Sequence, residues 1–464
     1  MTFADFILQH EGDDPVRLLL ARDKYPDIDL DLAVTTLEVR RKLRTKVPEW
    51  YAVPSLVYPS RLSGEQCSSS ETALYKALVA MGFRRDEWLR VGSRRSSERP
   101  AEAVSEGLIG REPQGDSRGA APPSNGRGWP QVSEGMSSPM KIADLTGGMG
   151  VDAWAFSKVA KEVLYNEMQL ELAKATELTF RELGVGNVVF RNREAVPGKV
   201  AEVLDGFEPD LIFLDPARRA EDGRKVFLIE DCRPDVLGLL PELFAASRHV
   251  MLKLSPMADI TMACKRLGEH VKEVHIVASG GECKELLFVL DREWEGSCST
   301  FVVEGGAVME IPGHPSTSSG TARDDIFRHG RPDRPSGYLF EPGKALAKAG
   351  AFGLPCTQFG MTKLGLHTHL YVGEVVPEEL RPFGKVFDIL EVLPLNNRTM
   401  KEVGKRYPQA EVTARNVPMT SDLMRRKIGC SSGGDMHLFG VRIDAGADSG
   451  NYLIISKRIL YGSD

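Results

Sequence analysis

The chain has 464 residues, of which 42% are hydrophobic and 27% are charged, a composition typical of folded proteins and long enough for about three domains. Its formal charge of −6 excludes a uniformly basic nucleic-acid-binding protein, and its seven cysteines, without a Cys-x-x-Cys pair, argue against a disulfide framework or a zinc site. The chain has neither an apolar run long enough to span a membrane nor a signal-peptide pattern, so we expect a cytoplasmic protein that binds no metal.

Residues 1–91 are predicted to form a mainly helical region. Asp14 and Pro15 have the form of an N-cap followed by a proline in the first helical turn. Ser68 and Glu71 match a capping box, and apolar residues at helical spacing follow them.

Two stretches lack the composition of a folded core. Residues 92–139 contain almost no aliphatic side chains and are predicted to be a disordered insertion. Residues 296–337, whose second half is rich in Pro, Ser and Gly, are predicted to be a linker or loop region.

The segment between them, residues 140–295, is predicted to form a doubly wound α/β sheet. Five short apolar runs alternate with helix-length segments, as expected for parallel strands that are buried on both faces. Two further runs are separated by only eight residues, which is too short for a crossover helix, so they are expected to be antiparallel neighbours. The seven runs are 142–145, 163–165, 188–190, 211–214, 250–254, 274–277 and 286–290.

The C-terminal part is predicted to be a smaller α+β module. From Ser336 onward it carries 16 Lys and Arg against 13 Asp and Glu, a net charge of +3, whereas the rest of the chain carries −9. A mildly basic module on an acidic body is compatible with an anionic partner.

A glycine-rich turn directly after the first strand of the sheet predicts a ligand site. Glycines allow the backbone to approach a ligand closely at the edge where open α/β sheets bind their ligands. The absence of a Gly-Lys-Ser/Thr sequence excludes a Walker phosphate loop. Glu167, at the end of the next strand, is placed to hydrogen-bond a ribose diol. The turn reads Asp144-x-Thr146-x-Gly148-x-Gly150-x-Asp152.

The fourth strand ends in a second candidate site. Asp215 follows this strand, so its carboxylate is expected to face the crevice of the sheet and to hold a substrate amine. Pro216 stiffens the backbone there, and Arg218 is a candidate contact for phosphate. The alternative is a turn-capping aspartate beside solvated arginines.

Three cysteines are weighed as nucleophiles for methylation of a pyrimidine carbon, which requires a covalent cysteine adduct. These are Cys67, Cys232 and Cys283. The fifth strand ends near Lys253 and offers no cysteine at its tip, so structural thiols are the favoured interpretation.

Residues 140–291 resemble the class I S-adenosylmethionine-dependent methyltransferases. The glycine turn matches the first motif of that superfamily, with Thr146 in place of its usual first glycine. The resemblance implies that S-adenosyl-L-methionine is the cofactor, that Glu167 holds its ribose and that Glu194 contacts its adenine amine. The cofactor-binding residues implied in this way are Asp144, Thr146, Gly148, Gly150, Asp152, Glu167 and Glu194.

The pair Asp215-Pro216 matches the fourth motif of the superfamily, and the resemblance implies a catalytic role for Asp215, Pro216 and Arg218. The Pro and aromatic residue that complete this motif in adenine-N6 enzymes are absent, because Ala217 and Arg218 follow. The sequence is more similar to the Asp-Pro of guanine-N2 rRNA methyltransferases.

Motifs outside this segment extend the resemblance to most of the chain. They are Gln66-Cys67-Ser68-Ser69, Lys253-Leu254-Ser255-Pro256-Met257, Glu282-Cys283-Lys284-Glu285-Leu286 and Thr413-Ala414-Arg415-Asn416. The chain resembles a bacterial methyltransferase family, common in Bacteroidetes, that ends in a ferredoxin-like piece and a THUMP-like domain. The resemblance implies the first over 338–382 and the second over 383–464.

THUMP domains are associated with structured RNA, so the resemblance implies RNA, either rRNA or tRNA, as the partner. In this module Arg415, Arg425, Arg426 and Lys427 are the expected phosphate contacts. The resulting hypothesis is a methyltransferase acting on a base nitrogen of RNA. Two alternatives are a small-molecule or protein methyltransferase and a catalytically silent RNA-binding protein on the same fold.

Overall fold

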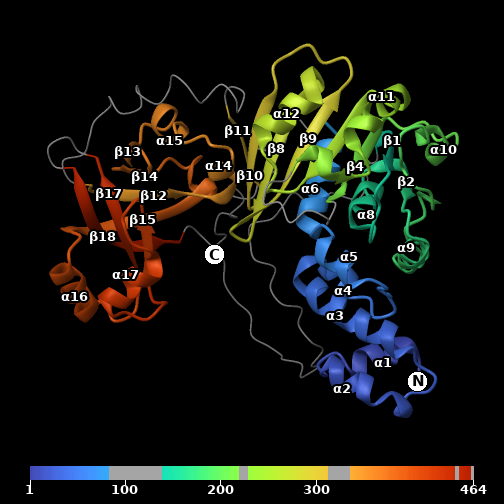
Figure 1. Ribbon diagram of the computed structural model, residues 1–464, viewed down its shortest axis with the longest axis horizontal. Coiled ribbons are helices and arrows are strands. Elements are labelled where there is room, and N and C mark those ends of the chain that lie inside the picture. Colours follow the sequence, from blue (N-terminus) through green and yellow to red (C-terminus); the bar gives the residue numbers. More distant parts are fainter. Residues whose placement is uncertain (83–137, 219–227, 312–334, 445–448, 461–464) are drawn as a thin grey trace, which may run out of the picture.

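The computed structural model describes residues 1–82, 138–218, 228–311, 335–444 and 449–460. The insertion predicted for 92–139 therefore falls outside the described residues, apart from its last two positions. Figure 1 shows three parts: N-terminal helices, a large central sheet with helices on both faces, and a C-terminal α+β module on the opposite side of the sheet from the N-terminus.

The central sheet has the order β11-β10-β8-β9-β7-β4-β1-β2-β3. Neighbours from β3 to β7 are parallel, whereas β9 is antiparallel to both β7 and β8, so the predicted doubly wound sheet with a reversed strand is confirmed. Its first seven strands are β1 (Ser138–Asp144), β2 (Ala160–Asn166), β3 (Val188–Arg191), β4 (Leu211–Leu214), β7 (His249–Leu254), β8 (Val271–Ser279) and β9 (Glu282–Asp291).

Two further strands of this sheet come from the segment predicted to be a linker. β10 (Ser299–Glu304) runs parallel to β8, and β11 (Ala307–Ile311) pairs antiparallel with β10. The linker prediction is therefore wrong for residues 299–311, and residues 312–334 lie outside the described residues. Two strands of five or six residues joined by a tight Gly-Gly turn give too weak an alternation to stand out from a loop.

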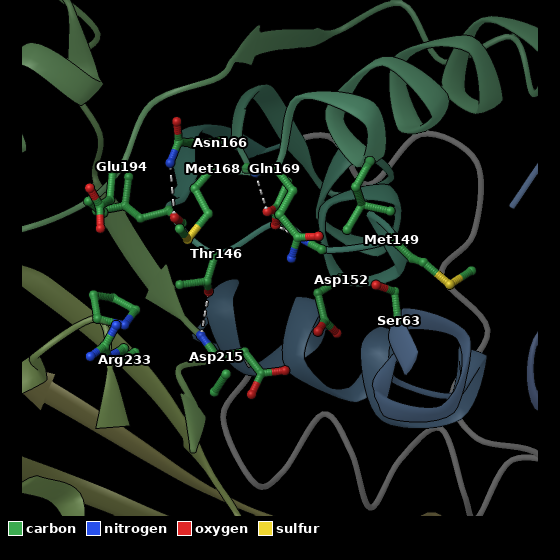
Figure 2. A pocket seen from close by; sticks show the side chains of 18 of the residues that line it. Ser63, Thr146, Met149, Asp152, Asn166, Met168, Gln169, Glu194, Asp215 and Arg233 are labelled. Atoms are coloured by element: carbon green, nitrogen blue, oxygen red, sulfur yellow. Dashed lines mark hydrogen bonds between the residues drawn. The ribbon is translucent and has the colours of Figure 1, made fainter. Parts of the chain in front are cut away.

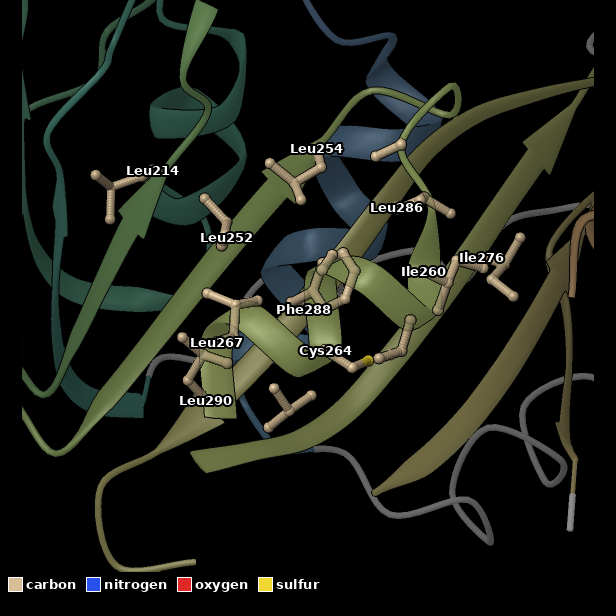
Figure 3. Packing of buried hydrophobic residues seen from close by; sticks show 14 of the residues in the cluster. Leu214, Leu252, Leu254, Ile260, Cys264, Leu267, Ile276, Leu286, Phe288 and Leu290 are labelled. Carbon is tan, nitrogen blue, oxygen red and sulfur yellow. The ribbon is translucent and has the colours of Figure 1, made fainter. Parts of the chain in front are cut away.

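Helices cover both faces of the sheet. One face packs against α10 (Val200–Leu204), α11 (Val236–Ala246) and α12 (Ile260–Leu267), and the other against α8 (Val151–Ser157) and α9 (Leu170–Glu182). Figure 3 shows Ile260, Cys264 and Leu267 of α12 over the aliphatic side chains of β7, β8 and β9. The two apolar layers arise because successive residues of a strand point to opposite faces.

The N-terminal region is helical, as predicted. Its elements are α1 (Phe3–Gln9), α2 (Pro15–Leu20), η1 (Arg22–Lys24), α3 (Leu30–Lys46), α4 (Pro48–Tyr51), α5 (Arg61–Gln66) and α6 (Ser70–Ala80). The carboxylate of Asp14 accepts from the Val16 N–H, which confirms the predicted cap. The predicted capping box is wrong by one residue, because the hydroxyl of Ser69, not that of Ser68, caps α6.

A buried network of charges joins α6 to the central sheet. The ammonium group of Lys76 is fully buried and lies 2.8 and 2.9 Å from the two carboxylate oxygens of Glu285 on β9. It also lies 3.1 Å from Oδ1 of Asp152 in the first turn of α8 and donates to the Ser68 hydroxyl at 3.1 Å. Ser68 in turn donates to Asp152 at 2.8 Å. Because it is not the cap of α6, Ser68 is free to complete this network.

Aromatic contacts strengthen the same junction. Trp50 of α4 packs edge-on against Trp154 of α8, with ring centroids 6.2 Å apart. The Tyr75 hydroxyl of α6 lies 2.7 Å from Nδ1 of His275 on β8. The N-terminal elements from the second half of α3 onward therefore share one core with this face of the sheet, whereas α1 and α2 pack with the first half of α3 in a separate cluster.

The C-terminal module contains a second sheet, of order β13-β14-β12-β15-β18-β17-β16. Its strands are β12 (Tyr338–Pro342), β13 (Thr362–Gly365), β14 (Thr368–Gly373), β15 (Gly384–Pro394), β16 (Glu411–Arg415), β17 (Met436–Ile443) and β18 (Gly450–Ile459). Its helices include α14 (Lys344–Lys348), α15 (Leu354–Thr357), α16 (Asn397–Arg406) and α17 (Ser421–Ile428).

Helix α14 fixes this module to the central sheet. Its Ala345 N–H donates to Glu304 of β10 at 2.9 Å, and Lys348 donates to the carbonyl of Ala258 at 2.8 Å. Leu346 and Tyr371 belong to the same apolar cluster as β7, β8 and β9. The part of the module around α14 and β14 therefore shares the core of the central sheet, whereas α16 and α17 pack in a separate cluster. None of the helices in the described parts of the chain combines the length and hydrophobicity needed to cross a lipid bilayer.

We predict that Lys76→Met destabilises the protein by about 3–5 kcal/mol, because it leaves the buried carboxylates of Glu285 and Asp152 without their cation. Lys42→Met is the control, since the ion pair of Lys42 with Glu65 is exposed, and it should cost less than about 1 kcal/mol. Urea unfolding followed by tryptophan fluorescence measures both, because Trp50 and Trp154 lie at this junction. Equal costs for the two variants would contradict the assignment.

Candidate active site

A cavity of about 580 Å³ lies at the carboxyl ends of the central strands, within the size range of small-molecule sites. It is lined by the turn after β1, the ends of β2 and β4, the loop after β3 and the C-terminal end of α5 (Figure 2). The structure brings six of the seven predicted cofactor residues and Asp215 into this cavity. These six are Thr146, Gly148, Gly150, Asp152, Glu167 and Glu194.

The two motif glycines of the turn, Gly148 and Gly150, are required for different reasons. A Cβ atom on Gly150 would lie 2.6 Å from Cγ2 of Thr176 and 2.7 Å from Cε2 of Phe180, and the backbone there has φ +86°. Gly148 has φ +52° and exposes its backbone to the cavity. The close approach to a ligand expected from the sequence thus applies to Gly148, whereas Gly150 allows α9 to pack against the turn.

Glu167 links the turn to the second strand. Its two carboxylate oxygens accept from the N–H groups of Gly148, at 2.9 Å, and of Gln169, at 2.8 Å. Each oxygen has a second lone pair, so the carboxylate can still accept from a ligand hydroxyl in the cavity. The acidic residue predicted to bind a ribose therefore also fixes the conformation of the turn.

Thr146 occupies the position of the usual first glycine for a structural reason. Its hydroxyl accepts a hydrogen bond of 2.6 Å from the N–H of Asp215, which ties the turn after β1 to the end of β4 (Figure 2). This bond sets the distance between the glycine turn and the aspartate. A glycine at position 146 could not make it.

Asp144 does not line the cavity, contrary to the prediction of a cofactor contact. Its carboxylate is buried below the turn and accepts from the Thr146 N–H at 3.0 Å. Burial, together with the charge of Asp152, raises the pKa of Asp144 well above its usual range. Asp144 therefore supports the turn instead of contacting a ligand.

Asp152 lines the cavity but already has partners. Its carboxylate is held by Ser68 and Lys76, the two N-terminal residues of the buried network. Asp152, the last residue of the glycine motif, therefore helps to hold α6 against the central sheet.

Asp215 forms an ion pair with Lys253 of the neighbouring strand β7. The side chain of Lys253 is only 12% exposed, and that of Asp215 is 31% exposed. Burial lowers the pKa of Lys253, but the nearby charges of Asp215, Glu285 and Asp152 outweigh this effect and raise it above its usual value. Lys253 is therefore a permanent cation that holds one oxygen of Asp215 and leaves the carboxylate at the cavity wall.

The residues after Asp215 differ from the prediction. Pro216 is buried and does not line the cavity, whereas Ala217 does. The short strand β5 (Ala217–Arg218) pairs with β6 (Cys232–Arg233), and the side chain of Arg218 lies outside what the structure describes. The structure brings two arginines to the cavity, Arg193 and Arg233, and the sequence did not single out Arg233 because it lies 18 residues beyond Asp215.

Glu194 is an exposed residue of the cavity wall on the loop after β3. Asn166 fixes this loop: its amide donates to the carbonyls of Leu145 and Arg193 and accepts from the Arg193 N–H at 3.0 Å. Glu194 is thereby held across the cavity from α5, at the end opposite Ser63 (Figure 2).

The three cysteines weighed as nucleophiles are unsuited to that role. Burial raises the pKa of Cys67, of Cys232 to about 12 and of Cys283 to about 11. The thiolate is the reactive form of cysteine, so these groups stay protonated near neutral pH. Of the three, Cys67 lines the cavity. Among the described residues, no group of His, Cys, Asp or Glu side chains is arranged to hold a metal ion.

The predicted RNA contacts lie in the C-terminal module, away from the cavity lining. Arg415 forms an ion pair of 2.7 Å with Glu341, and Arg425 contacts Asp422 and Glu411. Arg426 and Lys427 are exposed in the last turn of α17. The charge of this cluster is thus partly neutralised by the module's own carboxylates.

Comparisons with known proteins agree with this architecture. A model of a ferredoxin-like domain matches residues 338–380, and a model of a THUMP-like domain matches residues 384–458. A crystal structure from Porphyromonas gingivalis W83, described as a "putative methyltransferase", is 25% identical with a TM-score of 0.71 and covers 99% of this chain and 98% of its own. This chain has the methyltransferase fold with C-terminal ferredoxin-like and THUMP-like domains. The resemblance read from its motifs is thereby confirmed.

Other similar structures share only part of the fold. An rRNA methylase from Streptococcus thermophilus is 12% identical, covers 34% of this chain and 91% of its own, and has a TM-score of 0.26. TrmN from Thermus thermophilus is 17% identical, covers 34% and 45%, and also has a TM-score of 0.26. At this level of similarity neither bears on the function of the chain. No curated protein matches it significantly in sequence.

We predict that Glu167→Gln weakens binding of S-adenosylhomocysteine about ten- to a hundredfold, because the amide cannot accept from both backbone N–H groups and a ligand hydroxyl as the carboxylate can. Glu171→Gln, an exposed position on α9, is the matched control and should bind as the wild type does. Isothermal titration calorimetry measures both. Wild-type affinity in Glu167→Gln would remove Glu167 from the cofactor site.

Proposed function

We propose that this protein is an S-adenosyl-L-methionine-dependent methyltransferase that acts on a base nitrogen of RNA. The observation that carries the proposal is that one cavity is lined both by Glu167 with the glycine turn and by Asp215, which is paired with Lys253. The part of the cavity proposed to bind the cofactor, at Glu167 and the glycine turn, thus lies next to the part proposed to bind the acceptor, at Asp215. Transfer between two bound molecules requires such an arrangement.

The cavity residues fit the cofactor in chemical character. The Glu167 carboxylate retains acceptor capacity for a ribose, the Gly148 backbone is exposed, and Glu194 is available for an adenine amine. When bound, S-adenosyl-L-methionine supplies a methyl group activated by its sulfonium. The surrounding carboxylates favour a positively charged ligand.

The chain's own residues then position the acceptor. The carboxylate of Asp215 accepts a hydrogen bond from the amine of the acceptor base and orients its lone pair toward the cofactor half. Lys253 fixes the orientation of this carboxylate through their ion pair. Because the pKa of Lys253 is raised, it stays protonated and does not act as a base. After transfer the surplus proton of the acceptor nitrogen passes to Asp215 or to solvent.

RNA as the substrate is supported by the THUMP-like match over residues 384–458 and by the net positive charge of the C-terminal part. We propose that the domains are a helical region (1–91), a methyltransferase unit that begins with β1 and includes β10 and β11, a ferredoxin-like piece (338–382) and a THUMP-like domain (383–464). Arg415, Arg425, Arg426 and Lys427 remain the proposed phosphate contacts.

The direct test is mass spectrometry of modified nucleosides in total RNA from cells with and without the protein. We expect one methylated nucleoside to be lost in its absence and restored by wild-type protein but not by Asp215→Ala. Purified protein should also transfer a labelled methyl group to RNA from the deficient cells. If no nucleoside changes while S-adenosylhomocysteine still binds, a small-molecule or protein substrate takes precedence.

We predict that Arg426→Glu with Lys427→Glu weakens RNA binding without changing base preference, and lowers the slope of log affinity against log salt by about 2. Substitution is a better test than truncation, because Leu346 and Tyr371 belong to the core of the central sheet. The control is Lys24→Glu with Lys161→Glu, two exposed lysines far from α17 in sequence. Equal effects in both double variants would show that α17 has no specific role.

A further inference from the structure

The C-terminal end of α5 forms one wall of the cavity, although its sequence gives no sign of a ligand site. Ser63 and Gln66 lie one helical turn apart on the same face, and both line the cavity together with Cys67 and Ser68. The N-terminal helices thus complete a site whose other walls come from the methyltransferase sheet.

Helix α5 is held firmly in this position. A Cβ atom on Gly64 would lie 2.8 Å from Cγ1 of Val39, so α5 packs closely against α3 on the side away from the cavity. Lys46 of α3 donates to the carbonyl of Glu65 at 2.7 Å. At the other end, Ser68 is tied to Asp152 and Lys76 by the buried network.

The cavity-lining residues of this wall carry no charge, and the charged groups near them, Asp152 and Lys253, are already paired, so uncharged groups are left to contact a ligand. Asp152 is held by Ser68 and Lys76, and Lys253 is held by Asp215. Gln66 lines the cavity and is exposed, and its amide makes no hydrogen bond with any residue that the structure describes. An amide offers one donor and one acceptor side by side, which matches the edge of a nucleobase.

Two arginines, Arg193 and Arg233, line the cavity, and neither belongs to the α5 wall. Figure 2 shows Ser63 and Arg233 on opposite sides of the pocket, with Asp215 between them. An anionic group would be drawn toward Arg233, whereas a neutral base can lie between α5 and Asp215. This arrangement suits a nucleotide turned out of its stack, with its base inside the pocket and its phosphate near the rim.

We propose that α5 forms the acceptor subsite and that Gln66 reads the edge of the target base while Asp215 holds its reactive amine. This inference rests on the proposed function and adds the base-recognising residue to it. The N-terminal helical region is then a specificity element of the enzyme.

Photocrosslinking of the full chain tests the placement of RNA. The crosslinking amino acid p-benzoylphenylalanine is introduced at position 66, at position 65 as the matched control, and at position 427 as a reference in the C-terminal module. Glu65 is adjacent on the same helix but pairs outward with Lys42 and does not line the cavity. The probe is total RNA from cells that lack the protein, with S-adenosylhomocysteine present. We expect crosslinks at positions 66 and 427 but not at 65.

Kinetics tests the role of the Gln66 amide. We expect Gln66→Ala to lower kcat/KM for RNA methylation about 10- to 100-fold, with unchanged affinity for S-adenosylhomocysteine, while Glu65→Ala behaves as the wild type. A matching loss of S-adenosylhomocysteine affinity in Gln66→Ala would place this residue on the cofactor and overturn the proposal. Crosslinks at 427 without any at 66, or equal ones at 65 and 66, would also overturn it. RNA crosslinks at no position, with cofactor binding intact, would instead refute the RNA substrate.

Discussion

The buried cation of Lys76 is the interaction on which the architecture of the site depends. An ammonium group without solvent contact is stable only when carboxylates surround it, and here these come from β9 and from the first turn of α8. Burial raises the pKa of Glu285 despite the nearby charges of Lys76 and Lys253, which shows how strongly this junction is desolvated. The charge pairing therefore sets where the N-terminal helices meet the sheet.

This junction connects three parts of the cavity and its surroundings. Asp152 belongs to the glycine motif, Ser68 directly follows the cavity-facing end of α5, and Glu285 lies close enough to raise the pKa of Lys253. The glycine turn, the end of α5 and the cation beside Asp215 are thus parts of one electrostatic cluster. A change in any member alters the charge felt by the others, because the interior screens charges poorly.

The C-terminal module is connected to the site through packing. Helix α14 lies on β8, β9 and β10, and the apolar cluster is continuous from α12 to β14. Strands of the ferredoxin-like and THUMP-like segments share one sheet, through the pairing of β12 with β15. The ferredoxin-like segment therefore joins the core of the central sheet to the sheet of the THUMP-like segment.

The sequence by itself determined the central fold and half of the site. Apolar runs of strand length and the short spacing before the last two strands predicted the sheet and its reversed strand, since local hydrophobic pattern controls both. The glycine turn, Glu167 and Asp215 were found because each directly follows a strand, where ligands of α/β sheets lie.

Only the tertiary structure decided which polar residues act together. Lys76 and its partner Glu285 are 209 residues apart in the sequence, and its other partner Asp152 is also distant. No local pattern distinguishes a lysine that will be buried from one that stays in solvent. Local sequence likewise could not show that Asp144 supports the turn instead of lining the cavity. Nor could it show that Gln66 lines the cavity or that Lys253 pairs with Asp215. Long-range packing places these side chains, and their chemistry follows from the charges that they meet there.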